Sequence, residues 1–276
     1  MILRIWKQDV KKLLASYTTW ISFIIYLIIA FANILLVYSE QPTANPMYES
    51  MSSFEYFVSV QGGGSGFLFI FLPLAITLAT GDFFIKERRS SMLSYSLVRT
   101  GSKQYIWTKI TVFGTLSFLF VFVIQAILLI VTMTFFPFKL PALDQGIVFY
   151  AAPLFLNQPF LYCLLIILNQ SLMAFFYSCL SIFFSILFKN LYVAVMLPYV
   201  FFIGISQFLQ AMPMFSDELG LLLYNMSPLT MTGDFITKSF NWSIVPLYWV
   251  VLILVMIPLI SYIFNKKFTK ETLILR

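Results

Sequence analysis

The sequence contains no histidine among its 276 residues, and only 10% of the residues are charged. The missing imidazole excludes a histidine general base, a histidine-ligated zinc site and a nucleophile activated by histidine. The low charge excludes a water-soluble globular domain, which carries about 25% charged residues. Disorder is excluded too, because disordered segments have few aromatic residues and here 19% are aromatic. The composition therefore predicts an integral membrane protein.

Cysteine is also scarce. Cys163 and Cys179 are the only two and lie sixteen residues apart in one apolar stretch. On a continuous helix this spacing corresponds to about 24 Å, which is too far for a disulfide within the chain. We expect both thiols to be reduced and packed in the interior.

Long apolar runs dominate what the sequence does contain. A helix needs about 20 apolar residues to cross the hydrocarbon layer of a bilayer. Because proline interrupts helical hydrogen bonding, the helix within the uncharged stretch 145–188 is expected to begin near Pro159. The runs predict an all-α membrane protein with a single transmembrane domain of six spans, at residues 17–38, 67–85, 110–136, 159–187, 191–212 and 243–264.

The basic residues predict the sidedness of these spans. If the amino terminus is cytoplasmic, fifteen of the 17 lysines and arginines fall on the cytoplasmic side, and only Lys139 and Lys238 fall outside. Cytoplasmic loops of membrane proteins are enriched in basic residues. We therefore expect a multi-pass protein of the cell membrane with both termini in the cytoplasm. The abundance of Phe, Ile, Asn and Lys relative to Gly and Ala favours a bacterial source.

Two segments outside the spans have helical patterns. Residues 2–17 place apolar and basic side chains on different faces, which predicts an amphipathic helix along the inner leaflet; a helix buried against the rest of the protein is the alternative. Residues 213–242 are too polar to cross the membrane, but a leucine-rich stretch follows Ser216, and serine caps helix starts. We expect short re-entrant helices here, interrupted at Met226–Pro228, that dip into the outer leaflet before the last span.

Two motifs are interpreted as structural. The glycine-rich run 61–66 lacks the Lys-Ser or Lys-Thr pair that follows in a phosphate-binding loop, so it is read as a flexible entry to the second span. Asp82 is the only acid within a predicted span, and such carboxylates can mark ion relays. Lys86 lies four residues further on, a spacing at which helical side chains meet. An ion pair between the two is the favoured interpretation.

The cytoplasmic stretch 86–109 is the most informative part of the sequence. It is dense in charge and carries an apolar stripe at Met92, Leu93, Leu97 and Val98. Such a stripe is expected to be buried against a protein surface, which predicts a docking helix. The alternative is a positively charged loop that contacts anionic lipid headgroups.

This stretch resembles the cytoplasmic loop of the type-2 permease family of ATP-binding-cassette exporters. The matching positions are Lys86-Glu87-Arg88, Leu93, Leu97, Arg99, Lys103, Tyr105 and Lys109. The six-span layout, the amphipathic amino-terminal helix and the short helices before the last span resemble the same family, so the likeness covers the whole chain.

The resemblance implies a permease subunit that binds no cofactor or metal itself. Separate cytoplasmic ATPase subunits would bind ATP and Mg, and a second copy or a similar permease would complete the membrane part. The cargo would be hydrophobic or amphipathic, such as an antimicrobial peptide, a toxin, a drug or a lipid-linked compound, and would move outward. No nucleic-acid partner is implied. The ATPase would dock on Glu87, Arg88, Arg89, Leu93, Leu97, Arg99 and Lys103.

Three polar residues within the spans are candidates for the substrate path: Asn169, Gln170 and Gln207. Polar groups there favour a wet or protein-lined face, with hydrogen bonding between helices as the alternative. An intramembrane enzyme is disfavoured, because it would need paired acids or a nucleophile with its base. A sensor or immunity subunit that binds a peptide without transporting it stays open as an alternative function.

Overall fold

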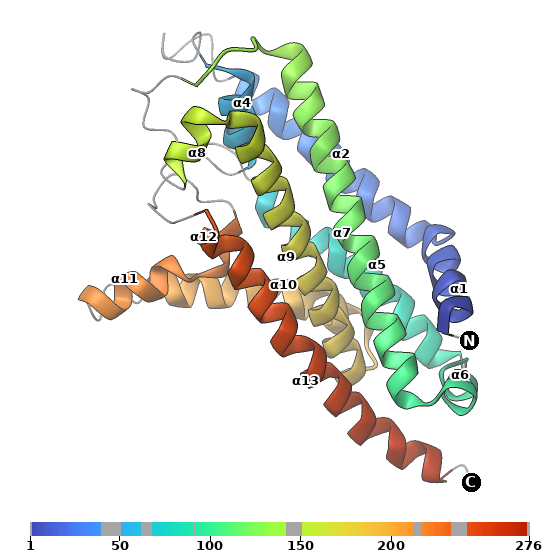
Figure 1. The fold of residues 1–276 in the computed structure, drawn as a ribbon. Helices are drawn as coiled ribbons and strands as arrows, with labels where there is room; N and C mark the ends of the chain where they lie inside the picture. Colours follow the sequence, from blue (N-terminus) through green and yellow to red (C-terminus); the bar gives the residue numbers. More distant parts are fainter. Residues whose placement is uncertain are drawn as a thin grey trace.

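The computed structural model describes residues 2–39, 51–61, 68–90, 92–141, 151–211, 217–232 and 242–274. Within these ranges all regular elements are α-helices. They form an elongated bundle (Figure 1). Helices α1 (Ile2–Leu14) and α6 (Met92–Thr100) lie at one end of it, and α4 (Ser53–Gln61) and α8 (Ala152–Asn157) lie at the other.

Six long helices make up the body of the molecule. Among the described residues, five of them are long and apolar enough to cross a membrane: α2, α7, α9, α10 and α13. The chain is thus an all-α protein with the helices of a membrane-embedded protein. The expected second span, 67–85, coincides with α5 from Leu68 onward, and residue 67 lies outside the described residues. The bounds of the six are α2 (Tyr17–Ser39), α5 (Leu68–Arg89), α7 (Ser102–Phe135), α9 (Pro159–Leu187), α10 (Leu191–Ala211) and α13 (Ile244–Ile274).

Helix α9 is the centre of the bundle. It packs against α5, α7, α10 and α13, and 78% of its most apolar stretch is buried. It begins at Pro159 as expected, because proline fits the first turn of a helix, where its missing N–H is not needed. Two of its buried serines donate to its own backbone: the hydroxyls of Ser171 and Ser185 lie 2.7 Å from the carbonyls of Ile167 and Ser181. Small residues of this kind let neighbouring helices approach closely.

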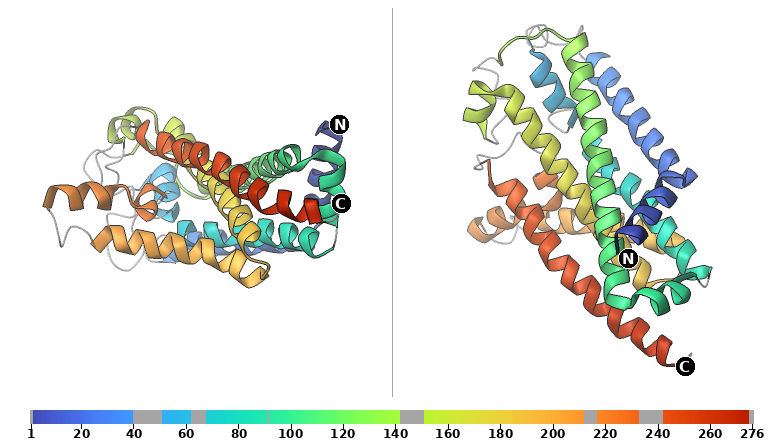
Figure 2. Two further views of the ribbon diagram at one scale, coloured as in Figure 1. Left: turned by 90° about the horizontal axis from the view of Figure 1, so that it is seen from below. Right: turned by 45° about the vertical axis from the view of Figure 1, so that its right-hand side comes forward.

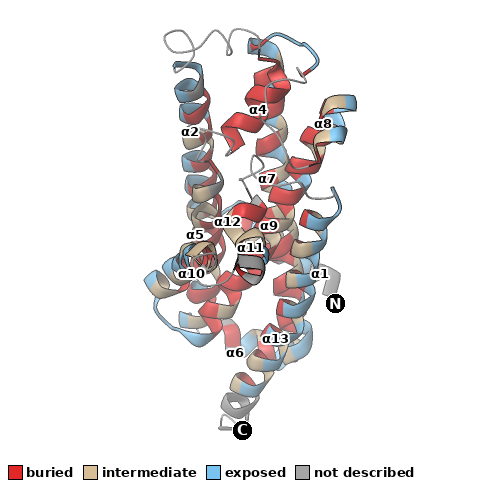
Figure 3. Cartoon of the chain, turned by 90° about the vertical axis from the view of Figure 1, so that its left-hand side faces the viewer, coloured by how far each residue is buried: buried red, intermediate tan, exposed pale blue. Residues whose placement is uncertain are grey.

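Helix α4 is short and buried along its whole length (Figure 3). Its start is a reciprocal capping box, in which the Ser52 N–H donates to the Glu55 carboxylate at 2.5 Å and the Glu55 N–H donates to the Ser52 hydroxyl at 3.3 Å. The Asn33 amide of α2 donates to the carbonyl of Val60 at 2.6 Å. These bonds hold α4 inside the bundle. The glycines that follow Gln61 lie outside the described residues.

Helix α10 departs from the direction of the other long helices and runs across the bundle (Figure 2). Two short helices follow it, α11 (Asp217–Asn225) and α12 (Pro228–Thr232). The interruption between them at Met226 and Ser227 agrees with the sequence, whereas Ser216, the expected cap, lies outside the described residues. Helix α12 packs back on α10, as the Leu229 N–H donates to the Ser206 hydroxyl at 3.1 Å.

The expectation for the two cysteines is confirmed, whereas the position of the N-terminal helix along the inner leaflet stays a prediction. Cys163 and Cys179 are both free and buried, as predicted. Helix α1 packs on α7 with Asp9 and Leu13 buried, while Trp6 is exposed.

Gly114 marks a close approach between α7 and α9. A methyl group at this position would overlap the ring of Phe175, whereas one at Gly204 of α10 would meet nothing within 4 Å. Alanine raises the helix propensity equally at both positions, by up to about 1 kcal/mol. We therefore expect Gly114→Ala to lower the free energy of unfolding by about 1–3 kcal/mol through overpacking. Gly204→Ala is expected to leave it unchanged or to raise it. Thermal unfolding of the detergent-solubilised variants measures the difference, and equal stabilities would contradict it.

Candidate functional site

The end of the bundle that carries α6 contains a polar pocket of about 320 Å³. Three helices and the start of a fourth meet there, and the stretch 86–109 that was singled out in the sequence surrounds it. The pocket is lined by Ile5, Gln8, Asp9, Lys12, Glu87, Tyr95, Ser96, Arg99, Thr100, Tyr105 and Lys109.

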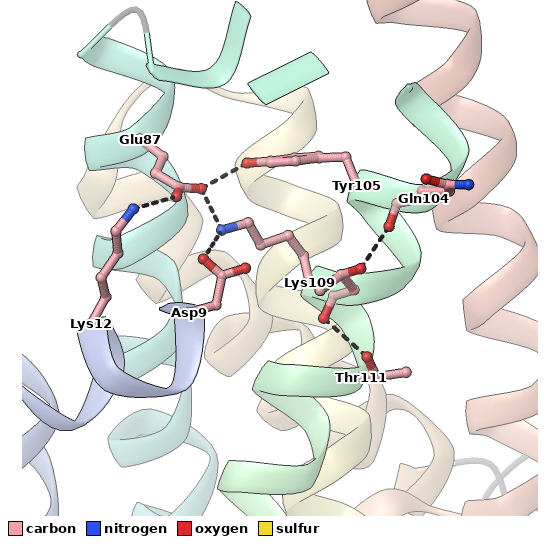
Figure 4. A network of polar contacts seen from close by, with 8 residues as sticks. Asp9, Lys12, Glu87, Gln104, Tyr105, Lys109 and Thr111 are labelled. Atoms are coloured by element: carbon pink, nitrogen blue, oxygen red, sulfur yellow. Dashed lines mark hydrogen bonds and ion pairs between the residues drawn. The ribbon is translucent and has the colours of Figure 1, made fainter. Parts of the chain in front are cut away.

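The floor of the pocket is a network of charged groups centred on Lys109 of α7 (Figure 4). Its Nζ lies 2.9 Å from Asp9 Oδ1 of α1 and 2.7 Å from Glu87 Oε2 of α5. Glu87 also accepts a hydrogen bond of 2.7 Å from the Tyr105 hydroxyl and lies 3.7 Å from Lys12 Nζ. We call Asp9, Lys12, Glu87, Tyr105 and Lys109 the charge cluster. It joins α1, at the start of the chain, to α5 and α7.

Burial makes the charge cluster energetically demanding. The Lys109 side chain is only 1% exposed, and an ammonium is tolerated out of water only with paired and hydrogen-bonded partners. Two acids and two lysines balance in formal charge. Burial raises the pKa of Asp9 above its usual value, while the neighbouring Lys109 acts to lower it. Within the part of the chain that the structure describes, one oxygen of Asp9, Oδ2, has no hydrogen-bond partner, so the carboxylate relies on Lys109.

Asp9 was not singled out in the sequence, although a signal exists. It lies four residues after Ile5 and four before Leu13, so it falls on the apolar face of α1 rather than among the basic residues of the other face. An acid on the buried face of a helix needs a basic partner. The sequence offers many basic residues, and only the fold determines that Lys109 is the partner of Asp9.

The residues predicted to dock an ATPase separate into three groups. Glu87 is buried in the charge cluster, and Leu93 and Leu97 are buried in the core of the same chain. Arg88 and Arg89 donate to backbone carbonyls at the C-terminal end of α9 and just beyond it, Arg88 to Ser185 at 2.9 Å and Arg89 to Lys189 at 3.5 Å. Arg89 is nevertheless exposed, as are Arg99 and Lys103.

The outward face of α6 carries Val98, which was expected in the buried stripe, and Tyr95, which the sequence analysis did not assign to docking. Tyr95 and Val98 are 73% and 83% exposed, and Arg99 lies beside them. We call Tyr95, Val98 and Arg99 the outer face of α6. The turn into α7 is made by Gly101, whose φ of 77° lies in the region that favours glycine.

The three candidates for a substrate path are not brought together. Gln170 is fully buried in a closed ring of amide hydrogen bonds: it donates to Gln61 at 2.8 Å, Gln61 donates to Gln125 at 2.6 Å, and Gln125 donates back to Gln170. Gln125 also donates to the Tyr26 hydroxyl at 3.0 Å. This glutamine ring ties α2, α4, α7 and α9 together, which is the interhelical alternative weighed from the sequence. The other two candidates differ: Asn169 is buried and its amide has no hydrogen-bond partner among the described residues, and Gln207 is exposed.

The expected ion pair between Asp82 and Lys86 is present at 2.5 Å. The Thr18 hydroxyl of α2 donates to the same carboxylate oxygen at 2.6 Å, so the pair also connects α5 to α2. Among the described residues, no group of three or more histidine, cysteine, aspartate or glutamate side chains is arranged to hold a metal ion.

No model of a known protein family matches the chain, and no curated protein matches it. The resemblance of the stretch 86–109 to type-2 permeases therefore stays a prediction from sequence pattern.

Replacing Lys109 tests whether the charge cluster holds this end of the bundle. Lys109→Met leaves two buried carboxylates with only Lys12 to balance them, and Asp9 loses its ion-pair partner. We therefore expect the free energy of unfolding to fall by about 3–5 kcal/mol. Lys103→Met removes an exposed lysine of the same helix and is expected to have little effect. Thermal unfolding in detergent measures both.

A second substitution separates charge from packing. Adding Asp9→Asn to Lys109→Met removes one of the uncompensated carboxylates, so the double variant is expected to regain part of the lost stability. Strictly additive losses would show that Lys109 acts through packing alone.

Proposed function

We propose that the chain is the membrane-spanning permease subunit of an ATP-driven exporter, with ATP and Mg bound by separate ATPase subunits. In this proposal α5 completes a six-span layout with the five apolar helices, both termini are cytoplasmic, and α1 lies along the inner leaflet. The distribution of basic residues supports this orientation. Helices α1, α6 and the C-terminal part of α13 lie at one end of the molecule (Figure 1), as the orientation requires.

The observation that carries the proposal is the two-sided character of α6. Leu93 and Leu97 anchor it in the core, while Tyr95 and Val98 present apolar surface beyond the membrane helices. Exposed apolar residues edged by charge mark protein interaction sites. Arg99 and Lys103 provide such an edge. A cytoplasmic ATPase that binds the outer face of α6 would contact a helix that is anchored in the core, so its movement would be transmitted to the membrane helices.

The links of α6 to its neighbours support a mechanical role. Helix α5 ends at Arg89 and α7 begins at Ser102, so α6 is joined to both by only a few residues. The charge cluster joins the same two helices to α1. A displacement of α6 is therefore passed to α5, α7 and α1 together, and a permease without a nucleotide site of its own needs such a route.

The membrane part is proposed to act as a pair, formed with a second copy or a similar permease. Helices α10 and α13 leave most of their apolar surface uncovered, which provides faces for a second subunit, for lipid and for a hydrophobic or amphipathic cargo. An antimicrobial peptide, a toxin, a drug and a lipid-linked compound all have this character.

A charge placed on the outer face of α6 tests the proposal. The chain is purified in mild detergent from its source cells, ATP hydrolysis by the sample is measured, and any ATPase subunit is identified by its phosphate-binding loop. We expect Val98→Asp to remove at least nine-tenths of the hydrolysis, because a buried charge opposes docking. Leu140→Asp, at an equally exposed apolar residue just beyond the other end of α7, is expected to leave it unchanged.

The outcomes are distinct. The docking proposal fails if no ATPase subunit co-purifies with the unaltered chain. It also fails if the Val98→Asp sample hydrolyses ATP as fast as the unaltered chain. ATP-dependent uptake of a candidate peptide into inverted vesicles then separates a transporter from a subunit that only binds the peptide.

A further inference from the structure

A groove of about 350 Å³ lies between α2 and α10, with α5 as its floor. Its walls are apolar, with Leu78 from α5 and Leu191, Val195 and Met196 from α10. One end is closed by the ion pair of Asp82 and Lys86 and by Thr18. The proposed function makes no use of this groove.

The groove lies at the level expected for lipid headgroups. Tyr17, at the start of α2, is 86% exposed, and Tyr192, at the start of α10, is exposed as well. Tyrosine and tryptophan concentrate at the two membrane–water interfaces, and Trp20 of α2 is exposed nearby in sequence. The groove has apolar walls and a polar end at the level of these tyrosines. A phospholipid has the same arrangement, with apolar acyl chains and a polar headgroup.

Positive charge collects at the polar end. The Lys86 side chain is 67% exposed although its ammonium contacts Asp82. Arg89, one turn further along α5, donates to the carbonyl of Lys189, and Lys189 lies two residues before Leu191 of the groove wall. Asp82 is the only acid that lines the described groove, and Lys86 neutralises it. Arg89 and Lys189 do not line the groove itself, but they add positive charge beside its polar end.

The N-terminal ends of two helices add to the positive charge at the polar end of the groove. Helices α2 and α10 both begin at the groove, and helix N-termini carry a partial positive charge that favours anions. Asn190 already accepts the N–H of Tyr192 at 3.0 Å, so the attraction comes mainly from the side-chain cations and the helix dipoles rather than from free backbone donors.

We propose that this groove binds one anionic phospholipid, with its phosphate between Lys86, Arg89 and Lys189 and an acyl chain along Val195 and Met196. Basic pockets between membrane helices on the cytoplasmic side suit such headgroups. The lipid fills the space between α2 and α10 and holds α10 in its crosswise position against α5. The proposal requires only that the helices are membrane-embedded, so it stands apart from the proposed transport function.

Native mass spectrometry of the full-length protein in detergent, titrated with phosphatidylglycerol or phosphatidylcholine, tests the proposal. We expect phosphatidylglycerol to bind at least tenfold more tightly. The double variant Arg89→Gln/Lys189→Gln is expected to lose about tenfold in affinity for phosphatidylglycerol. Lys7→Gln/Lys11→Gln removes two exposed lysines of α1 and is expected to leave the affinity unchanged, which separates the groove from general surface charge.

A third variant tests the acyl-chain part of the site. Met196→Trp fills the groove without changing charge, at a half-exposed position, and is expected to weaken phosphatidylglycerol binding about tenfold. Glycerol phosphate, which has the headgroup charge without the chains, is expected not to compete. Equal affinity for the two lipids, an unchanged affinity in Met196→Trp, an equal loss in the α1 variant or competition by glycerol phosphate would each overturn the proposal.

Discussion

Lys109 places a lysine ammonium out of water between the carboxylates of Asp9 and Glu87, and the arrangement of α1, α5 and α7 follows from that requirement. A buried ammonium is stable only while both partners stay in place, so the three helices cannot separate without exposing unpaired charge. Helix α6 joins α5 to α7 through very short links. Its position, and the outward direction of Val98, are therefore consequences of the same cluster.

The glutamine ring is the counterpart of the charge cluster deeper in the bundle. Gln61, Gln125 and Gln170 are all fully buried, and in an apolar environment an amide without partners is costly, so the ring determines how α4, α7 and α9 align. Gln125 follows Lys109 by sixteen residues on one continuous helix, or about 24 Å. A tilt of α7 that strains the charge cluster therefore also strains the glutamine ring. In this way α7 couples the two ends of the bundle.

The features that could be predicted from sequence are local, and those that could not are formed between distant segments. The start of α9 at Pro159 and the pair of Asp82 with Lys86 follow from proline geometry and from a four-residue spacing. The partners Asp9 and Lys109 are 100 positions apart, and Gln61 and Gln170 are 109 apart. Periodicity in a single sequence indicates which face of a helix is buried, but it carries no information on which other helix covers that face.

The stretch 86–109 illustrates this limit and determines what a partner protein is able to contact. Leu93 and Leu97 of the expected stripe are buried, but the surface that covers them belongs to the same chain. Glu87 likewise points into its own bundle. Val98 of the same stripe was expected to be buried and is exposed instead. In the proposed complex a partner would contact Tyr95, Val98 and Arg99 instead, on a helix whose inner side packs in its own chain. Because force applied to an unanchored loop would be lost in its own motion, the internal use of Leu93, Leu97 and Glu87 is what makes the outer face of α6 suitable for transmitting a push.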